Sequence, residues 1–125
     1  MVKLFVYGTL LTGEGNWSWA LNPQVGIPDR LKGAKLYNLG SFPGIKLSDN
    51  PDDEVIGEMF EIPLEKLSTI DRLEGYNPHK ESTSMYSRIE VVLSSGETAY
   101  TYRYNGSTTE ESRIQFGDWR KRRQL

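Results

Sequence analysis

The sequence predicts an α+β domain: a small mixed, antiparallel-rich β-barrel flanked by short helices. Three observations support this prediction. Six short segments have the apolar and β-branched content of strands, with turn residues between them. One further segment has helical spacing of its apolar residues, a proline at its start and a glycine at its end. The 125 residues contain no repeat or low-complexity linker, so we expect one domain over residues 1–119 and a basic tail at 120–125.

The first expected strand covers residues 2–7, which are apolar on both alternating faces and therefore suit a strand that is covered on both sides. A short helix over residues 16–21 follows. The remaining strands are expected at residues 34–39, 44–47, 55–62, 86–93 and 98–104. The last two should form a hairpin, because Ser94, Ser95 and Gly96 supply turn residues between them.

Composition excludes several classes of protein. A net charge of −2 provides no overall field for nucleic acid or for an acidic substrate. The stretch from Arg120 to Arg123 holds 4 of the 15 basic residues and leaves 11 basic against 17 acidic residues elsewhere; such terminal runs are usually solvated, so nucleic-acid binding is disfavoured. The absence of cysteine excludes a disulfide framework and a thiolate nucleophile. No apolar run suits a signal peptide or a membrane span, so a cytoplasmic protein is expected.

The clear helix covers residues 64–74 and ends at Gly75. Its apolar stripe consists of Leu67, Ile70 and Leu73, and its solvent-facing positions are Glu65, Ser68, Thr69, Asp71 and Arg72. Glu74 differs from these polar residues, because its direction falls inside the apolar stripe. A carboxylate that points toward a core is costly unless it is paired, hydrogen-bonded or protonated.

Two interpretations of Glu74 remain open from helix phase alone. At a frayed helix end the side chain would reach water. At the mouth of a cavity it would be a general acid and base, with a pKa raised from roughly 4.3 towards 7, which needs about 3–4 kcal/mol of differential environment. Partial burial in an apolar cavity mouth supplies an effect of that size.

The glycine turn after the first strand suggests a binding site for a small anion. Gly8 and Gly13 have the spacing that opens a phosphate-binding loop, but Glu14 stands where that loop needs a lysine, which excludes nucleotide hydrolysis. Gly8 would allow a carboxylate to approach backbone N–H groups, and Thr9 would add a hydroxyl donor. A plain strand-ending corner is the alternative. No metal site is expected, since the single histidine, His79, lies in a polar loop without ligand spacing.

Several short motifs, taken in order, resemble those of the γ-glutamyl cyclotransferase-like family, which includes γ-glutamylamine cyclotransferases and plant avirulence-induced proteins. The likeness covers about residues 2 to 119. The motifs are YGTL at residues 7–10, GSFPG at 40–44, VIGEMFEI at 55–62, DRLEG at 71–75, MYSR at 85–88 and GDW at 117–119.

This resemblance implies a cofactor-independent enzyme that releases 5-oxoproline and an amine from a small-molecule γ-glutamyl substrate. Glu74 matches the family's catalytic glutamate. Tyr7, Gly8, Thr9 and Leu10 match the turn that binds the substrate's α-carboxylate, and Tyr86 matches a tyrosine that orients substrate or glutamate. Arg88 matches a recurrent position for which a structural salt bridge and substrate contact are both open. The short chain favours a γ-glutamylamine-type or open cavity over a glutathione-dedicated one. Candidate entrance residues are Trp17, Trp19, Phe42 and Tyr76, for which core packing is an equal alternative.

A function from a different class remains open. One fold hosts many functions, so the same barrel would also suit a small-molecule-binding or interaction module without turnover.

Overall fold

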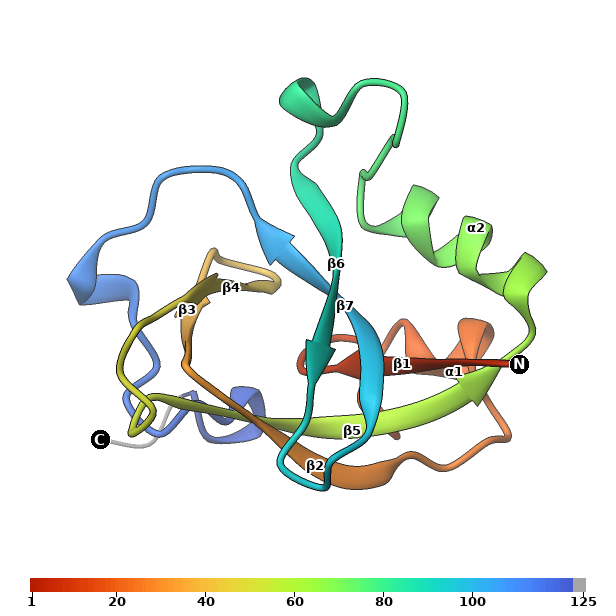
Figure 1. Cartoon of the computed structure of the whole chain (residues 1–125), viewed down its shortest axis with the longest axis horizontal. Helices are drawn as coiled ribbons and strands as arrows, with labels where there is room; N and C mark the ends of the chain where they lie inside the picture. Colours follow the sequence, from red (N-terminus) through yellow and green to blue (C-terminus); the bar gives the residue numbers. More distant parts are fainter. Residues whose placement is uncertain (123–125) are drawn as a thin grey trace.

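The computed structural model describes residues 1–122 and consists of a five-stranded mixed sheet, a separate two-stranded sheet and short helices (Figure 1). The large sheet has the order β2-β5-β1-β7-β6. Its strands are β1 (Val2–Val6), β2 (Ile27–Lys32), β5 (Glu54–Ile62), β6 (Tyr86–Val92) and β7 (Thr98–Tyr104). The small sheet pairs β3 (Ala34–Asn38) with β4 (Pro43–Leu47).

Strand β1 lies at the centre of the large sheet, as its two apolar faces predict. It pairs antiparallel with β5, where Leu4 is opposite Phe60, and parallel with β7, where Leu4 is opposite Tyr100. Leu4 and Phe5 are almost completely buried. The chain that leaves β1 at Tyr7 therefore follows a buried strand that is paired on both sides.

The α+β class and the mixed, antiparallel-rich sheet are confirmed, but the expected barrel is wrong. The large sheet ends at β2 on one side and at β6 on the other, and these edge strands do not pair with each other. Strands β3 and β4 pair mainly with each other, with one isolated bridge from Tyr37 to Arg113. The seven strands are thus divided between two sheets, and neither closes.

Strand β2 is an edge strand that the sequence analysis did not identify. Its residues are mostly exposed, with only Leu31 fully buried, and it contains Pro28. A strand of this kind has no clear apolar alternation, and proline is tolerated in a sheet mainly at its edges.

Two helices flank the large sheet: α1 (Trp17–Ala20) and α2 (Leu64–Leu73) (Figure 1). Helix α2 follows Pro63 and ends at Glu74, its C-cap residue. Gly75 then takes the left-handed backbone conformation, with φ of +67°, and turns the chain away. Three 3-10 turns lie at Glu81–Thr83, Glu110–Ser112 and Trp119–Lys121.

The first residues of the basic C-terminal segment lie against the domain. Arg120 donates a hydrogen bond to the carbonyl oxygen of Thr12, and the Arg122 guanidinium lies 4.1 Å from the ring centroid of Trp119. The last part of the predicted tail, residues 123–125, lies outside the described residues. Over residues 1–122, no helix combines the length and apolar character needed to cross a membrane.

Candidate active site

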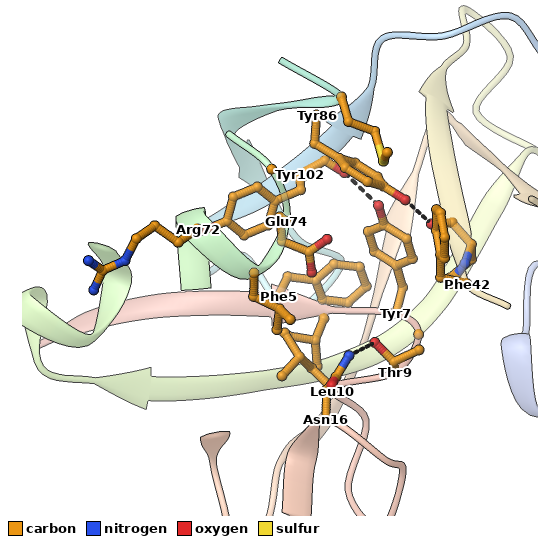
Figure 2. A pocket seen from close by; sticks show the side chains of 16 residues that line it. Phe5, Tyr7, Thr9, Leu10, Asn16, Phe42, Arg72, Glu74, Tyr86 and Tyr102 are labelled. Carbon is orange, nitrogen blue, oxygen red and sulfur yellow. Dashed lines mark hydrogen bonds between the residues drawn. The ribbon is translucent and has the colours of Figure 1, made fainter. Parts of the chain in front are cut away.

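A cavity of about 360 Å³ lies between the loop after β1 and the C-terminal end of α2 (Figure 2). Its volume is in the range of sites that enclose small molecules. The residues that line it are Phe5, Val6, Tyr7, Gly8, Thr9, Leu10, Asn16, Phe42, Pro43, Arg72, Leu73, Glu74, Gly75, Met85, Tyr86 and Tyr102.

Gly8 is required by close packing in the wall of this cavity. A Cβ atom at this position would lie 2.4 Å from Cγ of Pro43, which is too close for any side chain. The glycine after the apolar strand therefore lets the loop lie directly against the start of β4. This close approach explains the abrupt break in the sequence pattern after Tyr7.

Hydrogen bonds to its own backbone carbonyl groups hold the shape of the loop after Gly8. The Gly8 carbonyl accepts from the Leu11 N–H at 3.0 Å, and the Thr9 carbonyl accepts from the Asn16 N–H at 3.0 Å. The Asn16 side-chain amide also donates to the Thr9 hydroxyl at 2.8 Å (Figure 2). Within residues 1–122 the backbone N–H groups of Thr9 and Leu10 have no protein acceptor, so the loop offers hydrogen-bond donors beside the cavity.

Thr12 anchors the far side of this loop through all three of its polar groups. Its N–H donates to Glu58 Oε1 at 2.6 Å, its hydroxyl accepts from the Gly26 N–H at 3.0 Å, and its carbonyl accepts from Arg120. Glu58 is buried on strand β5, which pairs with the central strand β1. These anchors have no local sequence signal, because their partners lie 14 to 108 residues away from Thr12.

Glu74 is half-buried and its carboxylate points into the cavity, toward the side where Tyr7 lies (Figure 2). No hydrogen-bond donor of residues 1–122 engages the carboxylate. Burial raises the pKa of Glu74 from 4.5 to about 7. At neutral pH the ionised and protonated forms are therefore both populated, which is the condition a general acid and base needs.

Two tyrosine hydroxyls in the wall are held by backbone carbonyls. The Tyr7 hydroxyl donates to the Tyr102 carbonyl at 2.6 Å, and the Tyr86 hydroxyl donates to the Pro43 carbonyl at 2.5 Å (Figure 2). Burial, with a further contribution from the Glu74 charge, raises the pKa of both tyrosines above the usual range. Both side chains therefore stay neutral and fix the cavity wall.

Arg88 does not line the cavity. It forms an ion pair with Asp71, with 2.5 Å between Nη1 and Oδ2, and its guanidinium lies 5.6 Å from the ring centroid of Tyr76 and 5.1 Å from that of Tyr100. The second oxygen of Asp71 accepts from the Tyr102 hydroxyl at 2.5 Å. The expectation that Asp71 faces solvent is wrong, because strands β6 and β7 bring these two donors to it and bury it.

The structure thus brings together most of the site residues expected from the sequence. Those that line the cavity are Tyr7, Gly8, Thr9, Leu10, Glu74 and Tyr86, whereas Arg88 lies behind its wall. Of the candidate entrance aromatics, Phe42 lines the cavity and Trp17, Trp19 and Tyr76 do not. Asn16, Met85 and Tyr102 were not predicted, and only the fold reveals their position. No cluster of three potential metal ligands occurs within residues 1–122.

Residues 4–121 match the family model described as gamma-glutamyl cyclotransferase, AIG2-like. The chain is 35% identical over 127 residues to the gamma-L-glutamyl-butirosin B gamma-glutamyl cyclotransferase of Niallia circulans, with 98% of this chain and 78% of that protein covered. The solution structure of ytfP from Escherichia coli has a TM-score of 0.63 at 28% identity, covering 94% of this chain and 96% of that one.

An uncharacterized protein from Pyrococcus horikoshii has the same fold, with a TM-score of 0.73 at 23% identity and coverage of 97% of this chain and 92% of that one. The match with the family model spans nearly the whole described chain, including both the loop after β1 and the end of α2. The chain therefore belongs to the γ-glutamyl cyclotransferase, AIG2-like family.

Proposed function

We propose that this protein is a γ-glutamyl cyclotransferase that converts a γ-glutamyl amide into 5-oxoproline and a free amine. Glu74 is the general acid and base, and the Tyr7–Leu10 turn binds the α-carboxylate of the substrate. The observation that carries the proposal is the half-buried Glu74 carboxylate, which shares one cavity with the unpaired amides of Thr9 and Leu10.

The reaction balances with the groups of the substrate and Glu74. The Glu74 carboxylate takes one proton from the α-ammonium, and the freed amine attacks the γ-carbonyl carbon to close a five-membered ring. Glu74 gives its proton to the leaving nitrogen, and the bond from the γ-carbon to that nitrogen breaks, which releases a neutral amine. The ring nitrogen then gives its second proton to the regenerated Glu74 carboxylate, which passes it to the released amine, so the products are 5-oxoproline and the protonated amine.

The loop amides contribute by positioning. A γ-glutamyl chain is flexible, and cyclisation is fast only when the α-amine lies next to the γ-carbonyl. Holding the carboxylate at Thr9 and Leu10 restricts the chain near that folded conformation. Tyr86 keeps its predicted role as an orienting residue, with its ring in the wall and its hydroxyl fixed by Pro43.

The Niallia circulans relative supports this assignment, since its name specifies cyclotransferase action on a γ-glutamyl compound. What we carry over from that relative to this protein is recognition of the γ-glutamyl group, not of the rest of its substrate. We propose that the protein acts in the cytoplasm on small-molecule γ-glutamyl substrates.

The test is release of 5-oxoproline from γ-glutamyl dipeptides, glutathione and γ-glutamyl-ε-lysine. We expect Glu74→Gln to lower kcat by about 10²–10⁴-fold, the usual contribution of a general acid and base. Glu65→Gln is the matched control, because Glu65 is an exposed glutamate on the same helix and should retain the wild-type rate. Wild-type turnover by Glu74→Gln would refute the mechanism. Binding of these compounds without product would instead indicate the non-catalytic binding module.

A further inference from the structure

The cavity has a closed end and an open end, and this difference sets the orientation of a bound γ-glutamyl amide. Gly8 and Leu10, at the proposed carboxylate site, are buried. The solvent-exposed lining residues are Arg72, Gly75 and Met85, at the end of α2 and just before β6. A substrate with its carboxylate at the closed end therefore extends its amine portion past Glu74 toward Gly75 and Met85.

The open end offers no counter-charge for a cation. Its apolar residue is Met85, which is 50% exposed. Among the described residues that line the cavity, Arg72 is the one basic residue, and its guanidinium points away from Glu74 (Figure 2). Glu74 is the one acidic residue of that described lining, and the cyclisation already uses it.

The backbone of this open end is fixed although the Met85 side chain is exposed. The Met85 N–H donates to the Gly75 carbonyl at 3.2 Å, and the Met85 carbonyl accepts from the Asn105 N–H at 2.9 Å. A methionine side chain is flexible and polarisable, and it adapts to apolar groups of different shapes. The backbone of Met85 is thus fixed beside the cavity, and its flexible side chain offers an apolar contact there.

From this arrangement we infer that the substrates are γ-glutamyl amides whose amine portion is uncharged and apolar, with Met85 as a specificity-determining residue. The inference rests on the proposed cyclotransferase function. Burying each methylene of the amine portion against this side chain should favour the substrate by about fourfold. A terminal ammonium at the same place would gain no acidic partner and would lose this apolar contact.

The decisive comparison uses two γ-glutamyl amides with the same five-carbon chain, made from n-pentylamine and from 1,5-diaminopentane. The second carries one additional group, a terminal amine that is protonated at neutral pH. For the wild-type protein we expect kcat/KM for 5-oxoproline release to be about tenfold or more higher for the pentylamide, equivalent to burial of about two methylenes.

Two variants at one position separate charge from the loss of apolar contact. Met85→Gln has similar length and no charge, so it should reduce the preference for the pentylamide without improving turnover of the diaminopentane amide. Met85→Glu adds a counter-charge and should raise kcat/KM for the diaminopentane amide above the wild-type value. Equal kcat/KM values in the wild type, or a preference for the cationic amide, would overturn the inference.

Calorimetric binding of both amides to Glu74→Gln distinguishes failure of this inference from failure of the proposed function. Tighter binding of the pentylamide, with no 5-oxoproline from either compound in the wild type, would refute the cyclotransferase and retain the apolar specificity. Equal binding, or no binding of either amide, would refute the apolar specificity as well.

Discussion

Replacing Glu74 with glutamine should stabilise the fold at alkaline pH, by an amount that follows from the surroundings of the carboxyl group. Burial raises its pKa from 4.5 to about 7, so the folded state disfavours the ionised form. This difference corresponds to about 3 kcal/mol of unfolding free energy once the group is ionised in both states. Glutamine has nearly the same shape and no charge, so the variant is free of this cost.

The sign of the effect depends on pH in a defined way. Because the pKa of Glu74 is higher in the folded state, the folded protein holds this proton while the unfolded chain releases it. The wild type therefore loses stability as pH rises through the interval from 4.5 to about 7. The cost is below about 1 kcal/mol at pH 5 and reaches about 3 kcal/mol at pH 8.

Urea denaturation at pH 5 and pH 8, followed by the fluorescence of buried Trp119, measures the free energy of unfolding of each variant. Glu74→Gln should resemble the wild type at pH 5 and exceed it by about 3 kcal/mol at pH 8. Glu65→Gln controls for loss of a charge from the same helix and should show no such pH dependence. An equal difference between Glu74→Gln and the wild type at both pH values would refute burial as the cause.

Two further substitutions test the walls of the site. Arg88→Met should lower the free energy of unfolding by about 2 kcal/mol in urea denaturation, because it leaves buried Asp71 with an uncompensated charge; an unchanged midpoint would contradict this. Gly8→Ala should destabilise by about 1–3 kcal/mol and reduce 5-oxoproline release, since its Cβ would displace Pro43. Retention of both stability and activity in Gly8→Ala would show that the close packing against Pro43 is not needed.

The sequence predicts elements that depend on local patterns and misses those that depend on distant partners. Residues 2–7, 64–74 and 98–104 have clear periodicity and strong end signals, and the structure has β1, α2 and β7 there. The separation of β3 and β4 from the large sheet has no local signal. Strand number alone does not determine whether a sheet closes, so the barrel was predicted where two open sheets exist.

The same distinction applies to the site. Helix phase predicts that Glu74 points inward, because the inward direction of α2 is set by its own apolar residues. Helix phase fails for Asp71, whose burial depends on Arg88 and Tyr102, 17 and 31 residues further along the chain. Met85 has no pattern that marks it as part of the cavity, and its position follows from pairing of the backbone with Gly75.

Asp71 and Glu74 lie three residues apart at the end of α2, and their carboxylates have different surroundings. Both oxygens of Asp71 accept charged or hydroxyl donors, so this carboxylate is committed to holding Arg88 and Tyr102. Glu74 has no such donor within residues 1–122, and its burial makes the ionised form costly. A carboxylate that is buried and unpaired accepts a proton readily. The network around Asp71 thus stabilises one wall of the cavity and leaves Glu74, in the proposed mechanism, free to meet the substrate ammonium.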